Sequence, residues 1–185
     1  MIIIPGKIPV ELSTVAYFIV PLTILFGIKK LKIWAVYSAM LSAVVYYSAM
    51  VLYGTQIYSD YTPYTVYMSI YNHGALLTYS YITLASTMFF KKDRYIIWIG
   101  IMFSILWALA LRPLVIVTKR VFIYDVLDAF WAYKYFPNLL VVAVPIFYIL
   151  FAAFIYFSVN FMYVLNKVIN KSQNKNKSKK LVDTI

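Results

Sequence analysis

The stretch LLVVAVPIFYILFAAFIYFSVNFMYVL, residues 139–165, decides the fold class of this chain. It contains no charged side chain. An α-helix rises about 1.5 Å per residue, so about 20 apolar residues cross the hydrocarbon core of a bilayer, which is about 30 Å thick. The stretch therefore predicts one transmembrane helix, in which Pro145 would introduce a kink.

The rest of the chain has the same apolar character. Of its 185 residues, 64% are hydrophobic and 12% are charged, whereas soluble domains are about half apolar and about a quarter charged. A soluble fold would have to bury more apolar surface than a chain of this size can enclose. The composition predicts an all-α, polytopic transmembrane helical bundle with no separate soluble module.

Four more apolar stretches precede the first one. We expect about five transmembrane helices, at about residues 10–28, 33–53, 65–90, 95–117 and 139–165. The first stretch could instead be a signal peptide, but its basic residues follow the apolar run rather than precede it.

Lysine and arginine predict the orientation of this bundle, because they are enriched in cytoplasmic loops. With the N-terminus outside and the C-terminus cytoplasmic, the outer side holds Lys7, Lys119, Arg120 and Lys134, while Arg112 lies within a helix. The cytoplasmic side then holds 12 of the 17 basic residues: Lys29, Lys30, Lys32, Lys91, Lys92, Arg94, Lys167, Lys171, Lys175, Lys177, Lys179 and Lys180. We therefore expect a multi-pass protein of the cell membrane.

Two segments do not fit a spanning helix. The segment VFIYDVLDAFWAYKY, residues 121–135, is too polar to span and too apolar to lie in water, so it predicts an interfacial helix on the outer surface. Residues 166–185 are rich in Lys, Asn and Ser and predict a basic, disordered cytoplasmic tail after a 1–165 bundle. This tail explains much of the net charge of +11, so we expect no nucleic-acid partner. Its lysines either hold anionic lipid headgroups or serve as a plain positive-inside anchor.

Polar groups inside a membrane are expensive, so each is a candidate functional residue. In the predicted topology, all such groups fall in the outer half of the bundle. They are Glu11, Ser13, Asn72, His73, Arg112, Asp125 and Asp128. This one-sided placement predicts a polar pocket at the depth of outer-leaflet lipid esters.

The chemistry of such a pocket would centre on two residues. His73 can act as a general base, and a serine hydroxyl such as that of Ser13 becomes a nucleophile when a base lies within hydrogen-bond reach. A carboxylate could orient the imidazole, and Arg112 could hold a lipid phosphate. Structural roles remain open: His73 could bond a neighbouring helix, Arg112 could extend to headgroups, and Ser13 could bond backbone.

Two short motifs resemble a known family. Residues 8–13, Ile-Pro-Val-Glu-Leu-Ser, resemble the opening of the core helix in the YwaF-type integral membrane proteins. Residues 70–74, Ile-Tyr-Asn-His-Gly, are similar to that family's His-Gly motif two helices later, and residues 125–135 weakly resemble its aromatic stretch before the last helix. The animal relative of this family is a transmembrane phospholipid acyltransferase. The resemblance, over about residues 8–156, implies acyl transfer with His73 as a catalytic residue.

The chain also departs from that family's pattern. Ser13 stands where the family has cysteine, and Glu11 stands where it has histidine. A hydroxyl lacks the nucleophilicity of a thiolate, so Ser13 is either a hydroxyl nucleophile or an inactive position. The family's Gly-Pro-Trp-Pro-like run is not present near Trp131.

Two classes of function follow. The first is a lipid-directed acyltransferase or hydrolase that uses Ser13 and His73. The second is a non-enzymatic membrane protein, either a small transporter or an assembly subunit. The chain has no cysteine and one histidine, so we expect no metal site and no cofactor, and membrane lipids are the expected partners.

Overall fold

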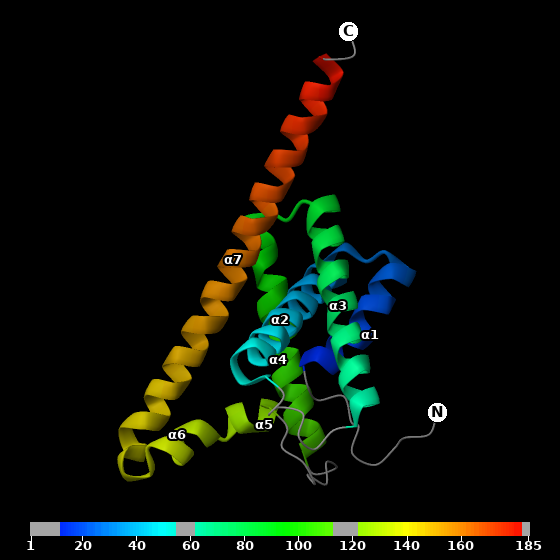
Figure 1. Ribbon diagram of the computed structural model, residues 1–185. Helices are drawn as coiled ribbons and strands as arrows, with labels where there is room; N and C mark the ends of the chain where they lie inside the picture. The colour runs from blue at the N-terminus through cyan, green and yellow to red at the C-terminus, as the bar shows by residue number, and fades with distance from the viewer. Residues whose placement is uncertain (1–11, 55–61, 113–121, 183–185) are drawn as a thin grey trace.

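A computed structural model describes residues 12–54, 62–112 and 122–182, without the side chains of residues 12, 122, 125 and 173–182 (Figure 1). Every element within these ranges is a helix. In chain order they are α1 (Leu12–Phe26), α2 (Lys29–Tyr53), α3 (Pro63–Ser86), η2 (Lys91–Asp93), α4 (Arg94–Leu111), α5 (Phe122–Leu127), α6 (Phe130–Tyr135), η4 (Pro137–Leu139) and α7 (Leu140–Val182).

Three helical segments within the described residues are long and apolar enough to cross a membrane, namely Lys29–Tyr53, Lys91–Leu111 and Pro137–Ser172. The apolar α1 is shorter, with 15 residues. The 24-residue α3 has sufficient length but contains many tyrosine, threonine and serine residues. The all-helical class is confirmed, and the three spans fit a membrane protein. The count of five and the orientation remain predictions.

Small residues allow α1 and α2 to pack closely. Ala35, Ala39 and Ala43 recur every four residues on α2, and each is fully buried, as is Ala16 on α1. In lipid there is little hydrophobic force between helices, so close contact between small residues becomes a main source of stability. The turn between the two helices is short because Gly27 adopts φ +63°, which a glycine reaches without strain.

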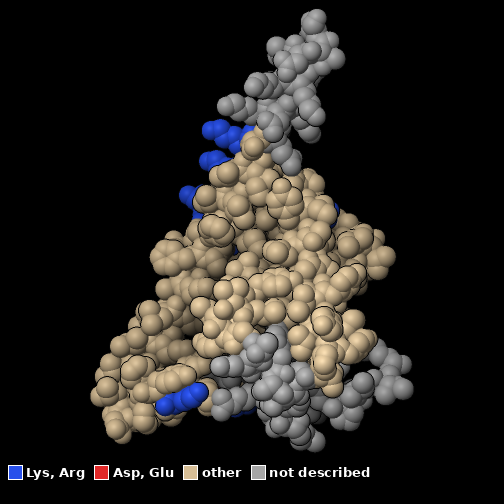
Figure 2. Space-filling view, in the orientation of Figure 1, with Lys and Arg blue, Asp and Glu red and all other residues tan. Residues whose placement is uncertain are grey.

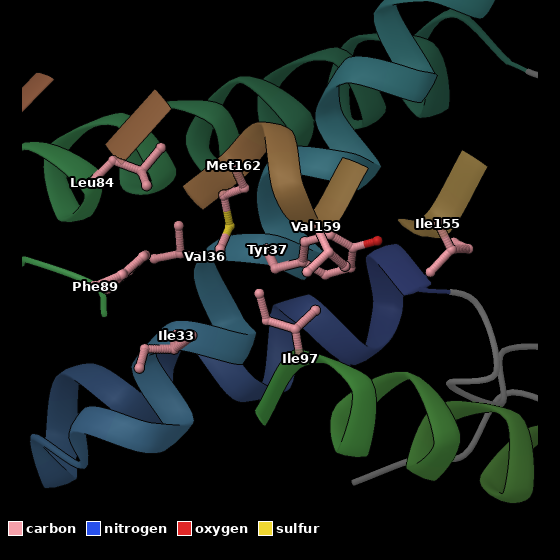
Figure 3. Close-up of a cluster of buried hydrophobic side chains, with 9 residues drawn as sticks. All are labelled: Ile33, Val36, Tyr37, Leu84, Phe89, Ile97, Ile155, Val159 and Met162. Carbon is pink, nitrogen blue, oxygen red and sulfur yellow. The ribbon is translucent and has the colours of Figure 1, made fainter. Parts of the chain in front are cut away.

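A second cluster joins four segments of the bundle to α7 (Figure 3). Its buried side chains come from α2, α3, the α3–η2 connection, α4 and α7. They are Ile33, Val36, Tyr37, Leu84, Phe89, Ile97, Ile155, Val159 and Met162. The middle of α7 therefore packs against the bundle at one crossing point.

Asn166 of α7 is hydrogen-bonded to the connection between α3 and η2. Its side chain is fully buried. Its Oδ1 accepts from the backbone N–H of Phe89 at 2.9 Å, and its Nδ2 donates to the carbonyls of Leu84 at 2.8 Å and Thr87 at 2.7 Å. Asn170 also donates to the Leu84 carbonyl, at 3.0 Å. These bonds satisfy backbone groups that the end of a helix leaves unpaired.

The sequence predicts a bundle over residues 1–165 and a tail over residues 166–185, and this division stays a prediction. In the structure, α7 passes Asn166 without a break and continues to Val182. We also expected one interfacial helix over residues 121–135. The structure has two short helices there, α5 and α6. Ala129, between them, adopts a left-handed conformation with φ +50°, so the helix does not continue from α5 into α6.

The basic residues at the helix starts lie at one end of the molecule. Lys29, which begins α2, and Lys92, in η2, both lie near the ring of Phe90. Arg94, which begins α4, bonds Asn160 and lies over the ring of Tyr163 on α7. We call this part, residues 27–32, 87–94 and 163–171, the basic end. In Figure 2, blue atoms gather beside the upper part of α7, and the broad middle of that face is tan.

Replacing Ala39 with leucine tests the close packing of α1 on α2. Ala39→Leu should lower the free energy of unfolding by about 1–3 kcal/mol, because the added atoms have no room. Ala110→Leu, on an exposed face of α4, should change it by less than about 0.5 kcal/mol. Unfolding in mixed detergent micelles measures both. Equal losses would contradict the packing described here.

Asn166→Leu tests the bonds between α7 and the α3–η2 connection. It should cost more than about 2 kcal/mol of unfolding free energy, because buried unpaired groups cost about 1–3 kcal/mol each. Asn170→Leu is the matched control, since the Leu84 carbonyl keeps its bond from Asn166. An Asn166→Leu protein as stable as the Asn170→Leu protein would refute a structural role for Asn166.

Candidate functional site

His73 is buried on α3 and has a defined proton position. Its Nδ1 lies 2.8 Å from the backbone carbonyl oxygen of Ser69, one turn earlier on the same helix. A carbonyl only accepts hydrogen bonds, so Nδ1 carries the hydrogen in this contact. In the neutral imidazole, Nε2 then holds the lone pair and is the nitrogen that can accept a proton.

Tyrosine side chains from two other helices surround His73. The ring of Tyr46, on α2, stacks on the imidazole at 3.7 Å between centroids with a 4° angle between planes. The ring of Tyr17, on α1, meets it edge-on at 6.1 Å, and the Tyr17 hydroxyl lies 3.5 Å from Nδ1. His73 is therefore held where α1, α2 and α3 meet.

Backbone contacts next to His73 fix α3 against α2. The Tyr47 hydroxyl donates to the carbonyl of Ile70 at 2.9 Å. Gly74 leaves room for this hydroxyl, because a Cβ at that position would lie 3.2 Å from it. Gly74 therefore allows α2 and α3 to approach closely, which supports the position of the imidazole.

Ser13 is not bonded to His73 in the structure. It lies half-buried in the first turn of α1, one turn before Tyr17. Among the described residues, the hydrogen-bonding neighbours of His73 are Tyr17 and Ser69. Tyr17, four residues after Ser13 on α1, supplies a hydroxyl that contacts the imidazole.

Arg112 and Asp128, two further candidates, form an ion pair at 2.8 Å. Both side chains are about half exposed. The guanidinium also lies over the ring of Tyr124, whose hydroxyl donates to the carbonyl of Ala108 at 2.9 Å. Arg112 is therefore occupied in joining the end of α4 to α5.

The remaining candidates are less defined. Asn72 lies half-buried on α3, beside His73 in sequence. Asp125 lies in α5, but its side chain is outside the described part, and so is the whole of Glu11. Where the structure describes the chain, no three His, Asp or Glu side chains are grouped closely enough to hold a metal ion.

A large apolar cleft lies between α2 and α7, and none of the predicted site residues lines it. Its volume is about 560 Å³. Its walls are the α2 residues from Tyr37 to Tyr53 and the α7 residues from Phe154 to Phe161. At one end, the Tyr37 hydroxyl is hydrogen-bonded to that of Ser158 at 2.8 Å, which ties the two walls together.

The cleft follows from the course of α7. The helix packs on the bundle around Met162 and Asn166, and it diverges from the bundle toward its own start (Figure 1). There α6 packs against it, and the Tyr148 hydroxyl donates to the carbonyl of Leu127 at 2.6 Å. The sequence reasoning missed both the cleft and the tyrosines around His73. For Tyr17, the sequence did contain a signal, because it follows Ser13 by one helical turn and therefore lies on the same face of α1.

Comparison with protein-family models, with curated proteins and with solved structures finds no match for this chain in any of the three.

Proposed function

We propose that this protein is a multi-pass membrane protein whose cleft between α2 and α7 holds a hydrocarbon chain of a membrane lipid. The observation that carries the proposal is the cleft itself, at about 560 Å³. Ligand pockets are typically about 300–1,000 Å³ in size and mostly apolar. Along α2 the walls extend over 17 residues, from Tyr37 to Tyr53, which corresponds to about 24 Å at a rise of 1.5 Å per residue.

The chemistry of the walls favours hydrocarbon over water. Most lining side chains are aliphatic or aromatic, such as Leu41, Val44 and Phe157. Four lining residues carry hydroxyls, namely Tyr37, Ser48, Tyr53 and Ser158, and the hydroxyls of Tyr37 and Ser158 bond one another. Both walls belong to helices that are long and apolar enough to span a membrane. In a bilayer, an apolar cleft that opens sideways is filled by lipid chains rather than by water.

We further propose five membrane passes in the cell membrane, with the N-terminus outside. The convergence of Lys29, Lys92 and Arg94 at the basic end supports this topology, because positive charge favours the cytoplasmic side. The cleft extends along α2 from Tyr37 toward Tyr53, away from Lys29. In this topology the lipid chain belongs to the outer leaflet, and membrane lipids are the partners.

A second candidate function, acyl transfer or ester hydrolysis on lipids, is favoured by His73. The Nδ1 contact to Ser69 leaves Nε2 as a base in a buried site. The resemblance of residues 8–13 and 70–74 to the YwaF-type membrane proteins supports the same reading. The nucleophile in this candidate is Ser13 or a water molecule. The alternative, a non-enzymatic protein such as a small transporter or an assembly subunit, does not require His73 to act as a base.

Filling the cleft tests lipid binding. The double variant Val44→Trp/Ser48→Trp places two indole rings in the cleft and should reduce the number of lipid molecules that co-purify with the protein. Ile99→Trp is the matched control, because Ile99 is exposed on α4. Native mass spectrometry counts the lipids that remain bound. A wild-type protein without bound lipid, or a filled cleft with unchanged lipid, would refute the proposal.

Substitution of His73 tests the enzymatic candidate. His73→Phe keeps a ring against Tyr46 but removes the base, and it should lower phospholipid turnover by about 100-fold or more. Ser13→Ala should cause a similar loss if Ser13 is the nucleophile and little change if water attacks. Mass spectrometry of lysolipid and fatty acid products gives the readout. Absence of turnover by the wild-type protein, or full activity of His73→Phe, would contradict this candidate.

A further inference from the structure

The ring of Phe90 brings together two lysines that are far apart in sequence. Lys29 begins α2, and its Nζ lies 4.8 Å from the centre of the ring. Lys92 lies in η2, and its Nζ is 6.0 Å from the same centre. Attraction between each ammonium and the aromatic face orients both side chains. The fold thus holds two like charges beside one ring.

No acidic group among the described residues forms an ion pair with this pair of lysines. The nearest acid in sequence, Asp93, accepts a hydrogen bond from the backbone N–H of Phe90 at 2.9 Å. The ion pair that the structure describes joins Arg112 to Asp128, on α4 and the turn after α5. Two ammonium groups beside one ring raise the local positive potential, so an anion that binds at this ring would be stabilised.

The neighbouring Arg94 has a different role. Its Nη1 donates to Asn160, its Nε donates to the carbonyl of Lys91, and its guanidinium lies over the ring of Tyr163. These contacts fix α4 against α7. Lys29 and Lys92 differ from Arg94 in this respect. Within the part of the chain that the structure describes, their ammonium groups lie beside the Phe90 ring and make no hydrogen bond to a protein acceptor.

The surroundings of Phe90 indicate where the anion comes from. Phe90 is 46% exposed, and the nearby Met88 and Ile28 are 57% and 50% exposed. Lys29 and Lys92 stand at the first residues of two helical segments that are apolar enough to span a membrane. An exposed apolar rim next to ammonium groups at a helix start matches the boundary between hydrocarbon and headgroups.

We propose that Lys29, Phe90 and Lys92 form a binding site for the headgroup of an anionic membrane phospholipid. The two ammonium groups contact the phosphate region, and Phe90, with Met88 and Ile28, contacts the upper part of the acyl chains. The site lies at the opposite end of α2 from Tyr53, so it does not depend on the lipid proposed for the cleft.

Lipid competition on the purified full-length protein tests this site. Native mass spectrometry compares retention of phosphatidylglycerol with that of phosphatidylcholine of the same acyl chains. The wild-type protein should prefer phosphatidylglycerol by about tenfold, and Lys29→Gln/Lys92→Gln should remove most of this preference. Lys30→Gln/Lys91→Gln is the matched control, because it removes the same charge from exposed lysines of the same elements and should leave the preference nearly intact.

Further measurements keep the test decisive if the double variant folds poorly. Phe90→Leu retains the apolar contact and both charges but loses the ring, so it should weaken the preference partially. Equal losses in the two double variants, or no preference in the wild-type protein, would overturn the proposal. Displacement of phosphatidylglycerol by millimolar inorganic phosphate would also overturn it, because the site would then bind a free anion.

Discussion

The hydrogen bonds of Asn166 are the constraint on which the arrangement of the helices depends. One buried amide pairs with a backbone N–H and two carbonyls at the α3–η2 connection. In an apolar environment these backbone groups would otherwise be unsatisfied, at a substantial cost in free energy. The amide therefore fixes α7 to the end of α3 and to the connection that leads to η2. The apolar cluster around Met162 packs beside that point (Figure 3).

The remaining geometry of α7 follows from this attachment. A long helix that is attached to the bundle at its middle diverges, toward its start, from helices that run at an angle to it. The Tyr37–Ser158 hydrogen bond marks the last tie between α2 and α7 before the cleft. At the start of α7, packing of α6 holds the helix away from the bundle (Figure 1). The cleft is therefore a consequence of the fold rather than of a polar motif.

The sequence predicted features that depend on periodicity and composition. The uninterrupted run at 139–165 indicated a spanning helix, and the apolar and basic segments located α2 and the start of α4 to within a few residues. The sequence could not place Asn166, because an asparagine next to a lysine-rich segment is typical of a solvated tail. It could not reveal the tyrosines around His73 either, since side chains on three helices meet only in the fold. Arg112 and Asp128 were predicted to line one pocket, and their ion pair joins two helices.

The most direct test of this account is the distance between α2 and the start of α7. The chain has no cysteine, so cysteines introduced at the exposed positions Val51 and Val141 carry spin labels at these two sites alone. In lipid bilayers, we expect one narrow distance distribution, and Asn166→Leu should broaden it, while Asn170→Leu should not. A broad distribution in the otherwise wild-type protein, or one that Asn166→Leu leaves unchanged, would contradict the account.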